Sequence, residues 1–294
     1  MINVYEQVSN NKIRSTAIIS FFIVFVLLVA YIITISFNLD NSLLFFAFIF
    51  SLFSSGASYF WGDKFVLTLN QARPATRKEF FNFYTVTENL SLANQTPVPK
   101  IYVIDSPAQN AFATGRDPQH ASICATTGLL AKLKRSELEA VVAHELSHVK
   151  NYDIRLMTIV SILIGSLSIL INLANRSTFF RRSDDNDNNS GIIFAVIGLV
   201  LIIFAPLIAQ LIQLAISRRR EYFADASAVK LTRQPQGLID ALKKISADPN
   251  KLETASTATA SLYIINPFKG NKIASLFSTH PPIEDRIKAL QQML

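Results

Sequence analysis

Four long stretches of the chain carry no charged residue, and they constrain its fold more than any other feature. They cover residues 15–39, 41–62, 156–175 and 188–217. Each has about 20 residues or more, enough for an α-helix rising ~1.5 Å per residue to cross ~30 Å of hydrocarbon. A buried core helix is the alternative interpretation of any single stretch. Together they predict an integral membrane protein with four transmembrane helices.

Basic residues near these stretches predict how the chain is oriented. Lys12 and Arg14 precede the first stretch, whose apolar run is too long for a signal peptide and lacks a small-residue cleavage site, which predicts a retained anchor. Lys and Arg also follow the second stretch, precede the third and follow the fourth; only the loop 176–187 departs, with three Arg against three Asp. The positive-inside rule then predicts a multi-pass protein of the cell membrane with both termini and both long polar segments in the cytoplasm.

The net charge and the cysteine count exclude several classes of protein. A formal charge of +7 is explained by this topology and by attraction to anionic lipid. The chain has no nucleic-acid-binding motif and no dense basic tract, so we expect no nucleic-acid partner. Cys124 is the single cysteine, which excludes an intrachain disulfide and a multi-thiolate metal site. We expect it to be a small buried apolar residue.

The chain divides into four parts along its length. Residues 1–62 are expected to form two membrane helices, and residues 156–217 a membrane helical hairpin. The polar segments 63–155 and 218–294 have about 170 residues together, a usual size for one domain. Neither segment is expected to form a folded domain by itself, and both are expected on the same side of the membrane. They predict one discontinuous domain into which the hairpin is inserted.

Local patterns predict the elements of this domain. The first polar segment is expected to contain a helix over 75–92 and strands over 100–106, 110–115 and 121–130. A further helix is expected to begin at Ser136, where Ser-x-x-Glu can form a capping box.

Two helices are predicted to leave the membrane side by side. No Gly or Pro occurs between Leu130 and Ile164, so the helix begun at Ser136 is expected to continue directly into the third stretch. After Pro206 no breaker occurs before Pro235, so the fourth stretch is expected to project into the cytosol as a helix in the same way.

The string His-Glu-Leu-Ser-His at 144–148 carries the strongest chemical signal. His144 and His148 are four residues apart, so on a helix they share a face, as two imidazole ligands of one zinc ion require. Glu145 follows the first ligand and can act as general base toward a water activated by the metal. The alternative interpretation is a chance string of polar residues.

A catalytic zinc site needs a third protein ligand and an open position. Glu221, His280 and His120 are the candidates. Glu221 is expected at the same height above the membrane as His148, on the second protruding helix, and Asp225, one turn later, can accept a hydrogen bond from the outer nitrogen of a histidine ligand. Solvated surface carboxylates are the alternative for both acids. His120 lies in a turn beside Pro118, which favours a structural role.

Several separated motifs resemble those of HtpX-type membrane zinc metalloproteases, a family related to the CAAX prenyl proteases. The resemblance covers nearly the whole chain and rests on the two N-terminal spans, NAFATGRDPQHASICATTGLL (110–130), LEAVVAHELSHVKNYD (138–153), SRRREYFADASAV (217–229) and STHPPIEDRI (278–287). Ordered motifs of this kind are far more specific than His-Glu-x-x-His alone.

The resemblance implies a fold and a function for the chain. The fold is α+β and integral to the membrane, with four transmembrane helices and a mainly helical, gluzincin-like catalytic domain that contains a small β-sheet. The site would hold one zinc per chain through His144, His148 and Glu221, with Glu145 as base. The implied activity is cleavage of unfolded or damaged membrane proteins from the cytoplasmic face, a role in protein quality control and the stress response.

Further residues are candidates for contacts with substrate. The stretch 110–115 resembles the family's active-site edge strand, which binds substrate backbone as an extra strand. His280 can stabilise the oxyanion, or can be a capping or surface histidine. Residues 251–279 are rich in small polar side chains and can form a flap or a surface loop. The edge-strand candidates are Asn110, Ala111, Phe112 and Ala113, with an ordinary strand as the alternative.

Two other functions are weighed against the endopeptidase. An intramembrane protease would place His-Glu-x-x-His inside an apolar span, but here Arg135, Lys150 and Asp153 flank the motif. A non-enzymatic membrane scaffold would need a structural zinc, usually closed by a fourth ligand that His280 could supply. A transporter would be expected to carry ionisable residues within its spans, and these four stretches have none. Cleavage preference and oligomeric state are left open.

Overall fold

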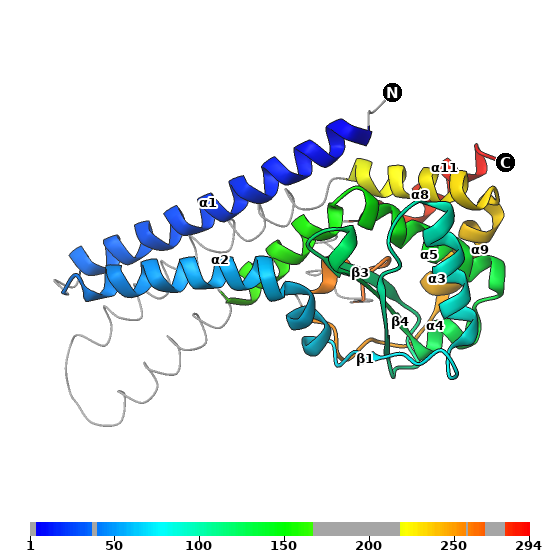
Figure 1. The fold of residues 1–294 in the computed structure, drawn as a ribbon, viewed down its shortest axis with the longest axis horizontal. Helices are drawn as coiled ribbons and strands as arrows, with labels where there is room; N and C mark the ends of the chain where they lie inside the picture. The colour runs from blue at the N-terminus through cyan, green and yellow to red at the C-terminus, as the bar shows by residue number, and fades with distance from the viewer. Residues whose placement is uncertain (1–3, 37–39, 167–217, 257, 268–279) are drawn as a thin grey trace.

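The computed structural model describes residues 4–36, 40–166, 218–256, 258–267 and 280–294. Two long helices lie side by side and extend away from a domain that combines helices with a small sheet (Figure 1).

The two long helices carry the first two predicted spans. They are α1 (Val4–Ser36) and α2 (Ser42–Leu69). Within them, Val8–Leu28 and Leu44–Leu69 are long and apolar enough to cross a membrane, yet only 33% and 28% of their residues are buried. A core helix of a soluble domain would bury most of its apolar side chains, whereas here they face outward, as lipid-facing helices require.

The third predicted span is present in part. Residues 153–166 are helical, and Leu156, Val160 and Leu163 join Phe22 and Val26 of α1 in one buried cluster. The rest of this stretch, 167–175, and the fourth stretch, 188–217, lie outside the described residues. Two of the four predicted spans are thus seen as complete long helices.

A mixed four-stranded sheet forms one layer of the domain, in the order β1-β2-β4-β3. The central strands β2 (Lys100–Ile104) and β4 (Ala121–Thr126) are parallel, with Tyr102 opposite Cys124. β1 (Arg73–Pro74) and β3 (Ala111–Gly115) pair antiparallel to them at the two edges. The predicted strands are confirmed, although the last one ends at Thr126, where the chain turns into a helix.

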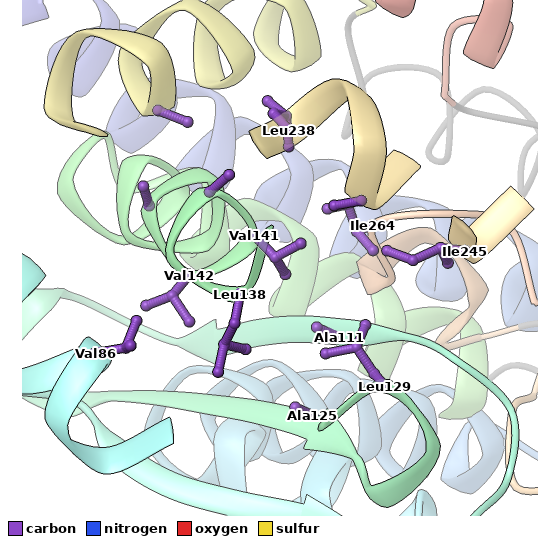
Figure 2. Packing of buried hydrophobic residues seen from close by; sticks show 14 of the residues in the cluster. Val86, Ala111, Ala125, Leu129, Leu138, Val141, Val142, Leu238, Ile245 and Ile264 are labelled. Atoms are coloured by element: carbon purple, nitrogen blue, oxygen red, sulfur yellow. The ribbon is translucent and has the colours of Figure 1, made fainter. Parts of the chain in front are cut away.

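Helices pack around the sheet or around α5 (Arg135–Lys150), which lies against the sheet, and bury the core between them. They are α3 (Phe81–Ala93), α4 (Thr127–Lys132), α5, α8 (Arg218–Thr232), α9 (Pro235–Ala247) and α11 (Ile283–Gln291). Leu138, Val141 and Val142 of α5 point into this core beside the sheet (Figure 2). Each such side chain contributes about 1.5–3 kcal/mol when fully buried. This packing fixes α5, the helix that carries the His-Glu-x-x-His motif, against the sheet.

The beginning of α5 differs from the prediction. The helix begins at Arg135, and the carboxylate of Glu137 accepts the backbone N–H of Lys134 at 2.7 Å. The expected capping box at Ser136 and Glu139 is therefore wrong, because the observed one lies two residues earlier, at Lys134 and Glu137. Glu137 is preferred because it is buried and also lies 2.7 Å from Nζ of Lys244 on α9.

The predicted continuous helix into the third span is also wrong. α5 ends at Lys150, and Tyr152 has a φ of 61°, in the left-handed region where a helix cannot continue. The charged groups of Lys12 of α1 and of Arg155 lie 4.6 and 4.9 Å from the centre of the Tyr152 ring. Contacts distant in sequence thus support a break that no Gly or Pro marks.

The helix expected over 75–92 begins six residues late, at Phe81. Residues 73–74 pair with β2 instead, and the N–H of Ala75 donates to the carbonyl of Ile101 at 3.0 Å. Arg73 is held there by Asp105 and Glu79, at 2.7 and 2.6 Å. Edge pairing of the sheet therefore replaces the first turns of the predicted helix.

Candidate metal centre and active site

Three buried side chains meet where α5 and α8 pack side by side. Nε2 of His144 and Nε2 of His148 are 3.2 Å apart. Glu221 of α8 approaches them from the neighbouring helix, with carboxylate oxygens 3.7 Å from the first nitrogen and 3.6 Å from the second. The exposed fractions are 1%, 5% and 2%. Among the described residues these three form a group whose ligand atoms all lie within 4.8 Å of one another.

Carboxylates hold the outer nitrogens of both histidines. Nδ1 of His144 is 2.9 Å from Asp225, and Nδ1 of His148 is 3.0 Å from Asp153. With a carboxylate on the outer nitrogen, each ring directs Nε2 toward the centre, as in metal sites whose histidines are oriented by an acid. Each acid thus lies beside the outer nitrogen of one ligand, and the pair of His148 and Asp153 also meets hydrogen-bond geometry.

The residues present fit a divalent metal ion. Oε2 of Glu221 is buried and has no hydrogen-bond partner among the residues that the structure describes. Two imidazoles and one carboxylate also form the His₂Glu donor set of many catalytic zinc sites, which leaves a further position open. His280 and Arg286 lie 3.2 and 3.4 Å from this Glu221 oxygen without hydrogen-bond geometry, and a bound cation would complement its negative charge directly.

Glu145 lies in the same buried space, next to the first histidine in sequence. Burial raises its pKa to about 7, and its carboxylate accepts the backbone N–H of Ala113 in β3. A carboxyl group with a pKa near neutrality can both accept and return a proton at physiological pH. Its position and its pKa therefore suit a general base.

Burial and neighbouring polar groups shift the pKa values of the three proposed ligands in different directions. Burial by itself raises the pKa of Glu221, but the interactions of its carboxylate with His280 and Arg286 outweigh burial and hold that pKa well below its usual range. Burial lowers the pKa of His144. For His148 the hydrogen bond to Asp153 and the charge of Glu221 overcome burial and raise the pKa to about 9. The carboxylate ligand is thus kept ionised, as metal binding requires.

Arg286 of α11 connects these groups. It is fully buried, and two of its nitrogens bind both oxygens of Asp225, at 2.8 and 2.7 Å. Its third nitrogen is 3.4 Å from Glu221 and donates to the carbonyl of Ile264 at 3.1 Å. Sequence reasoning missed this residue, although it lies in the terminal STHPPIEDRI motif.

The edge strand β3 runs alongside the site, and its first half is already paired. The N–H of Ile264 donates to the carbonyl of Ala111 at 2.9 Å, and Asn110 donates to the carbonyl of Ile265 at 2.9 Å. Phe112 forms a bridge with Tyr263, and the centres of their rings are 5.0 Å apart. The described part of the loop 251–279 is therefore packed against β3 at this point.

The two remaining histidines lie in different surroundings. His280 is buried, with Nδ1 3.2 Å from Glu221. It lines a cavity of about 300 Å³ together with Arg286, residues 264–266 and residues 281–283. His120 is half-exposed in the turn η1 (Pro118–His120), where Asp117 and Arg116 bind its ring at 2.7 and 2.9 Å. It is not among the residues grouped at the metal centre.

Two histidines and a glutamate on adjacent helices, with a second glutamate beside the first histidine, define a metallopeptidase of the His-Glu-x-x-His class. The profile of peptidase family M48 matches residues 82–294, and this chain belongs to that family. The chain is a metalloendopeptidase of a membrane protease family.

Similar proteins span nearly the whole chain. The protease HtpX homolog of Dictyoglomus turgidum is 44% identical over 98% of this chain and 94% of its own length. The homolog of Caldanaerobacter subterraneus subsp. tengcongensis is 43% identical, over 98% and 97%, and that of Streptococcus uberis is 41% identical, over 98% and 99%. The crystal structure of S. mikatae Ste24p aligns with 97% of this chain and 67% of its own, at 22% identity and a TM-score of 0.49.

Proposed function

We propose that this chain is an integral-membrane zinc endopeptidase that cleaves unfolded or damaged membrane proteins at the cytoplasmic face of the cell membrane. One zinc ion per chain is held by His144, His148 and Glu221. The observation that carries the proposal is the buried meeting of these ligands beside Glu145, with both histidines oriented by carboxylates. Protein quality control and the stress response are the proposed setting.

Each protein group has a defined part in the proposed reaction. Zinc, when bound, polarises the substrate carbonyl and acidifies water. Glu145 accepts a proton from the attacking water and returns it to the leaving amine. His280 donates a hydrogen bond to the negative charge that develops on the carbonyl oxygen. Asp225 keeps His144 in the orientation needed for binding.

The proposed substrates are extended segments near the membrane. Residues 110–113 lie at the edge of the sheet beside Glu145, so a peptide that adds to β3 would bring its backbone to the site. A folded segment cannot present its backbone in this way, which favours unfolded chains. Residues 263–265 occupy the first half of this edge, so substrate is expected to bind along the second half or to displace them.

The first experiment compares wild type with Glu145→Gln in detergent, both loaded with zinc and matched for metal content. We expect the variant to keep its zinc and to cleave an unfolded polypeptide about 10²–10⁴-fold more slowly, because the general base is lost. Glu139→Gln is the matched control, since it changes the same residue type on the same helix away from the site. Equal cleavage by wild type and Glu145→Gln would exclude Glu145 as the base.

A closed structural zinc site is the second candidate, with His280 as fourth ligand. Its support is that His280 lies 3.2 Å from Glu221 and that its ring nitrogens are buried without a hydrogen-bond partner in the described part of the chain. This candidate predicts that His280→Ala releases zinc from the protein. The endopeptidase predicts retained zinc and slower cleavage.

The proposed orientation can be tested through thiol labelling. Cys124 is fully buried, and burial raises the pKa of its thiol, so it gives little background reaction. We expect a membrane-impermeant thiol reagent added to intact cells to label Asn41→Cys, between α1 and α2, but not Lys132→Cys in the catalytic domain. Both positions are exposed. The reverse pattern would place the catalytic domain outside the cell.

A further inference from the structure

The first turns of α1 contact the turn that follows α5. Asn11 is 3% exposed, and its Nδ2 donates to the carbonyl of Asn151 at 2.9 Å and to Oδ1 of Asp153 at 2.7 Å. The next residue, Lys12, lies over the ring of Tyr152. Asn11 and Lys12 together thus contact all three residues of the turn 151–153.

This turn carries the carboxylate that orients one metal ligand. Oδ2 of Asp153 is 3.0 Å from Nδ1 of His148, while Oδ1 is bound by Asn11 and lies 3.4 Å from Arg220. Both Asp153 and His148 are buried, at 3% and 5% exposure. The position of Asn11 therefore affects the direction of Asp153, which in turn directs the imidazole.

We propose that Asn11 is a positioning residue of the metal centre, which makes the N-terminal membrane helix part of the site. An amide NH₂ group has two N–H donors, one for each acceptor found here. Because the amide is neutral, it orients the Asp153 carboxylate through a hydrogen bond and does not neutralise the negative charge of that carboxylate. A buried polar side chain on an apolar helix is costly unless it is hydrogen-bonded, and here its donors are used at the turn beside His148.

The test measures zinc affinity of the full-length protein in detergent by competition with a chromophoric chelator. Four proteins form a cycle: wild type, Asn11→Ala, Asp153→Ala and the double variant. We expect Asn11→Ala to weaken zinc affinity about tenfold, the low end for residues that support a ligand. In the Asp153→Ala background the same change should have no further effect, because Asn11 acts through that carboxylate. Asn10→Ala, the exposed neighbour, should match wild type.

Two results would overturn the proposal. One is wild-type zinc affinity in Asn11→Ala, and the other is an equal loss in both backgrounds, which indicates general damage to the turn. Thermal unfolding of the metal-free proteins checks the fold. If Asn11→Ala does not fold, Asn11→Ser, whose hydroxyl is too short to reach Asp153, repeats the cycle and is judged in the same way.

The role of Asn11 rests on the proposed zinc site, and the two can fail separately. If wild type binds no zinc, the proposed function is rejected together with the role of Asn11. If wild type binds zinc and the Asn11 variants bind it equally well, only the positioning role is rejected. With zinc saturating, Asn11→Ala is expected to lower kcat and leave KM unchanged, because Asn11 acts through Asp153 and His148 and its side chain is bonded to the turn 151–153. A changed KM with wild-type kcat contradicts the proposal.

Discussion

Arg286 balances the negative charge of two buried carboxylates at the metal centre. It binds Asp225 through two nitrogens and lies 3.4 Å from Glu221 through the third. Removing one partner of a buried charge pair leaves the other without compensation, which costs about 3–5 kcal/mol. A lysine would keep the charge but not the planar fork that grips both oxygens of one carboxylate.

We therefore predict that Arg286→Ala lowers the free energy of unfolding by about 3–5 kcal/mol and that Arg286→Lys keeps part of this stability but binds zinc more weakly. Thermal unfolding and chelator competition measure the two effects. Lys288→Ala, an exposed cation on the same helix, serves as control and should change neither. Wild-type zinc affinity in Arg286→Lys would show that the two-point grip on Asp225 does not support the ligands.

The sequence predicted the centre of the site but not all of its supports. The spacing of His144 and His148 predicts that they share a helix face. The expected height of Glu221 above the membrane, equal to that of His148, predicted that Glu221 lies beside them. Asp153 was missed because a continuous helix would direct a residue five positions after His148 to another side. The helix breaks at Tyr152, whose ring contacts α1, and this break places the carboxylate of Asp153 beside the ring of His148.

At the scale of elements, the segment 263–265 adds to the free edge of β3. Asn110 fastens it from the side, because its Nδ2 donates to the carbonyl of Ile265 while its Oδ1 accepts the N–H of Ala111 at 3.1 Å. The segment is short, and outside its bonds to β3 it follows a chain with little regular structure. Asn110 thus adds one side-chain hydrogen bond to an attachment that also includes the main-chain bond from Ile264 to Ala111 and the bond from Arg286 to the Ile264 carbonyl.

Asn110→Ala is predicted to loosen the segment at β3. The peptide that contains Ile264 should exchange its amide hydrogens at least several-fold faster in the protein without substrate, because loss of one hydrogen bond removes about 0.5–1.5 kcal/mol of protection. Hydrogen exchange read by mass spectrometry measures this, with the exposed Asn82→Ala as control. Unchanged exchange would show that the main-chain bond to Ala111 is sufficient.

Strands were easier to predict than helix ends in this chain. Gly, Pro and Asp punctuate the region 99–120 and mark where β2 and β3 end, and these are local signals. The ends of α3 and α5 are set instead by the sheet edge, by Lys244 of α9 and by α1. Such contacts join residues distant in sequence, so a local pattern cannot contain them.

At the scale of the whole molecule, the helical pair and the catalytic domain are joined through the site. The end of α1 and the beginning of α2 lie far from the sheet, while the beginning of α1 and the end of α2 meet the catalytic domain (Figure 1). Lys12 and Arg14 lie near the beginning of α1, at the end that meets the catalytic domain, as the positive-inside rule expects for a cytoplasmic domain. This arrangement supports the proposal that the zinc lies next to the membrane surface.

Phe53 and Phe81 provide a matched test of which surface faces lipid. Both are exposed, at 69% and 58%, but Phe53 lies inside the apolar window of α2 and Phe81 at the start of α3. Phe53→Asp should reduce the fraction of protein that resists alkaline extraction from membranes, because an acid near the centre of a span costs about 2.5–3.5 kcal/mol on insertion. Phe81→Asp should leave this fraction unchanged, since that side chain already faces water. Equal resistance of both variants would mean that the outward face of α2 at Phe53 is covered by protein, and the apolar surface of the helical pair would then be an interface between chains.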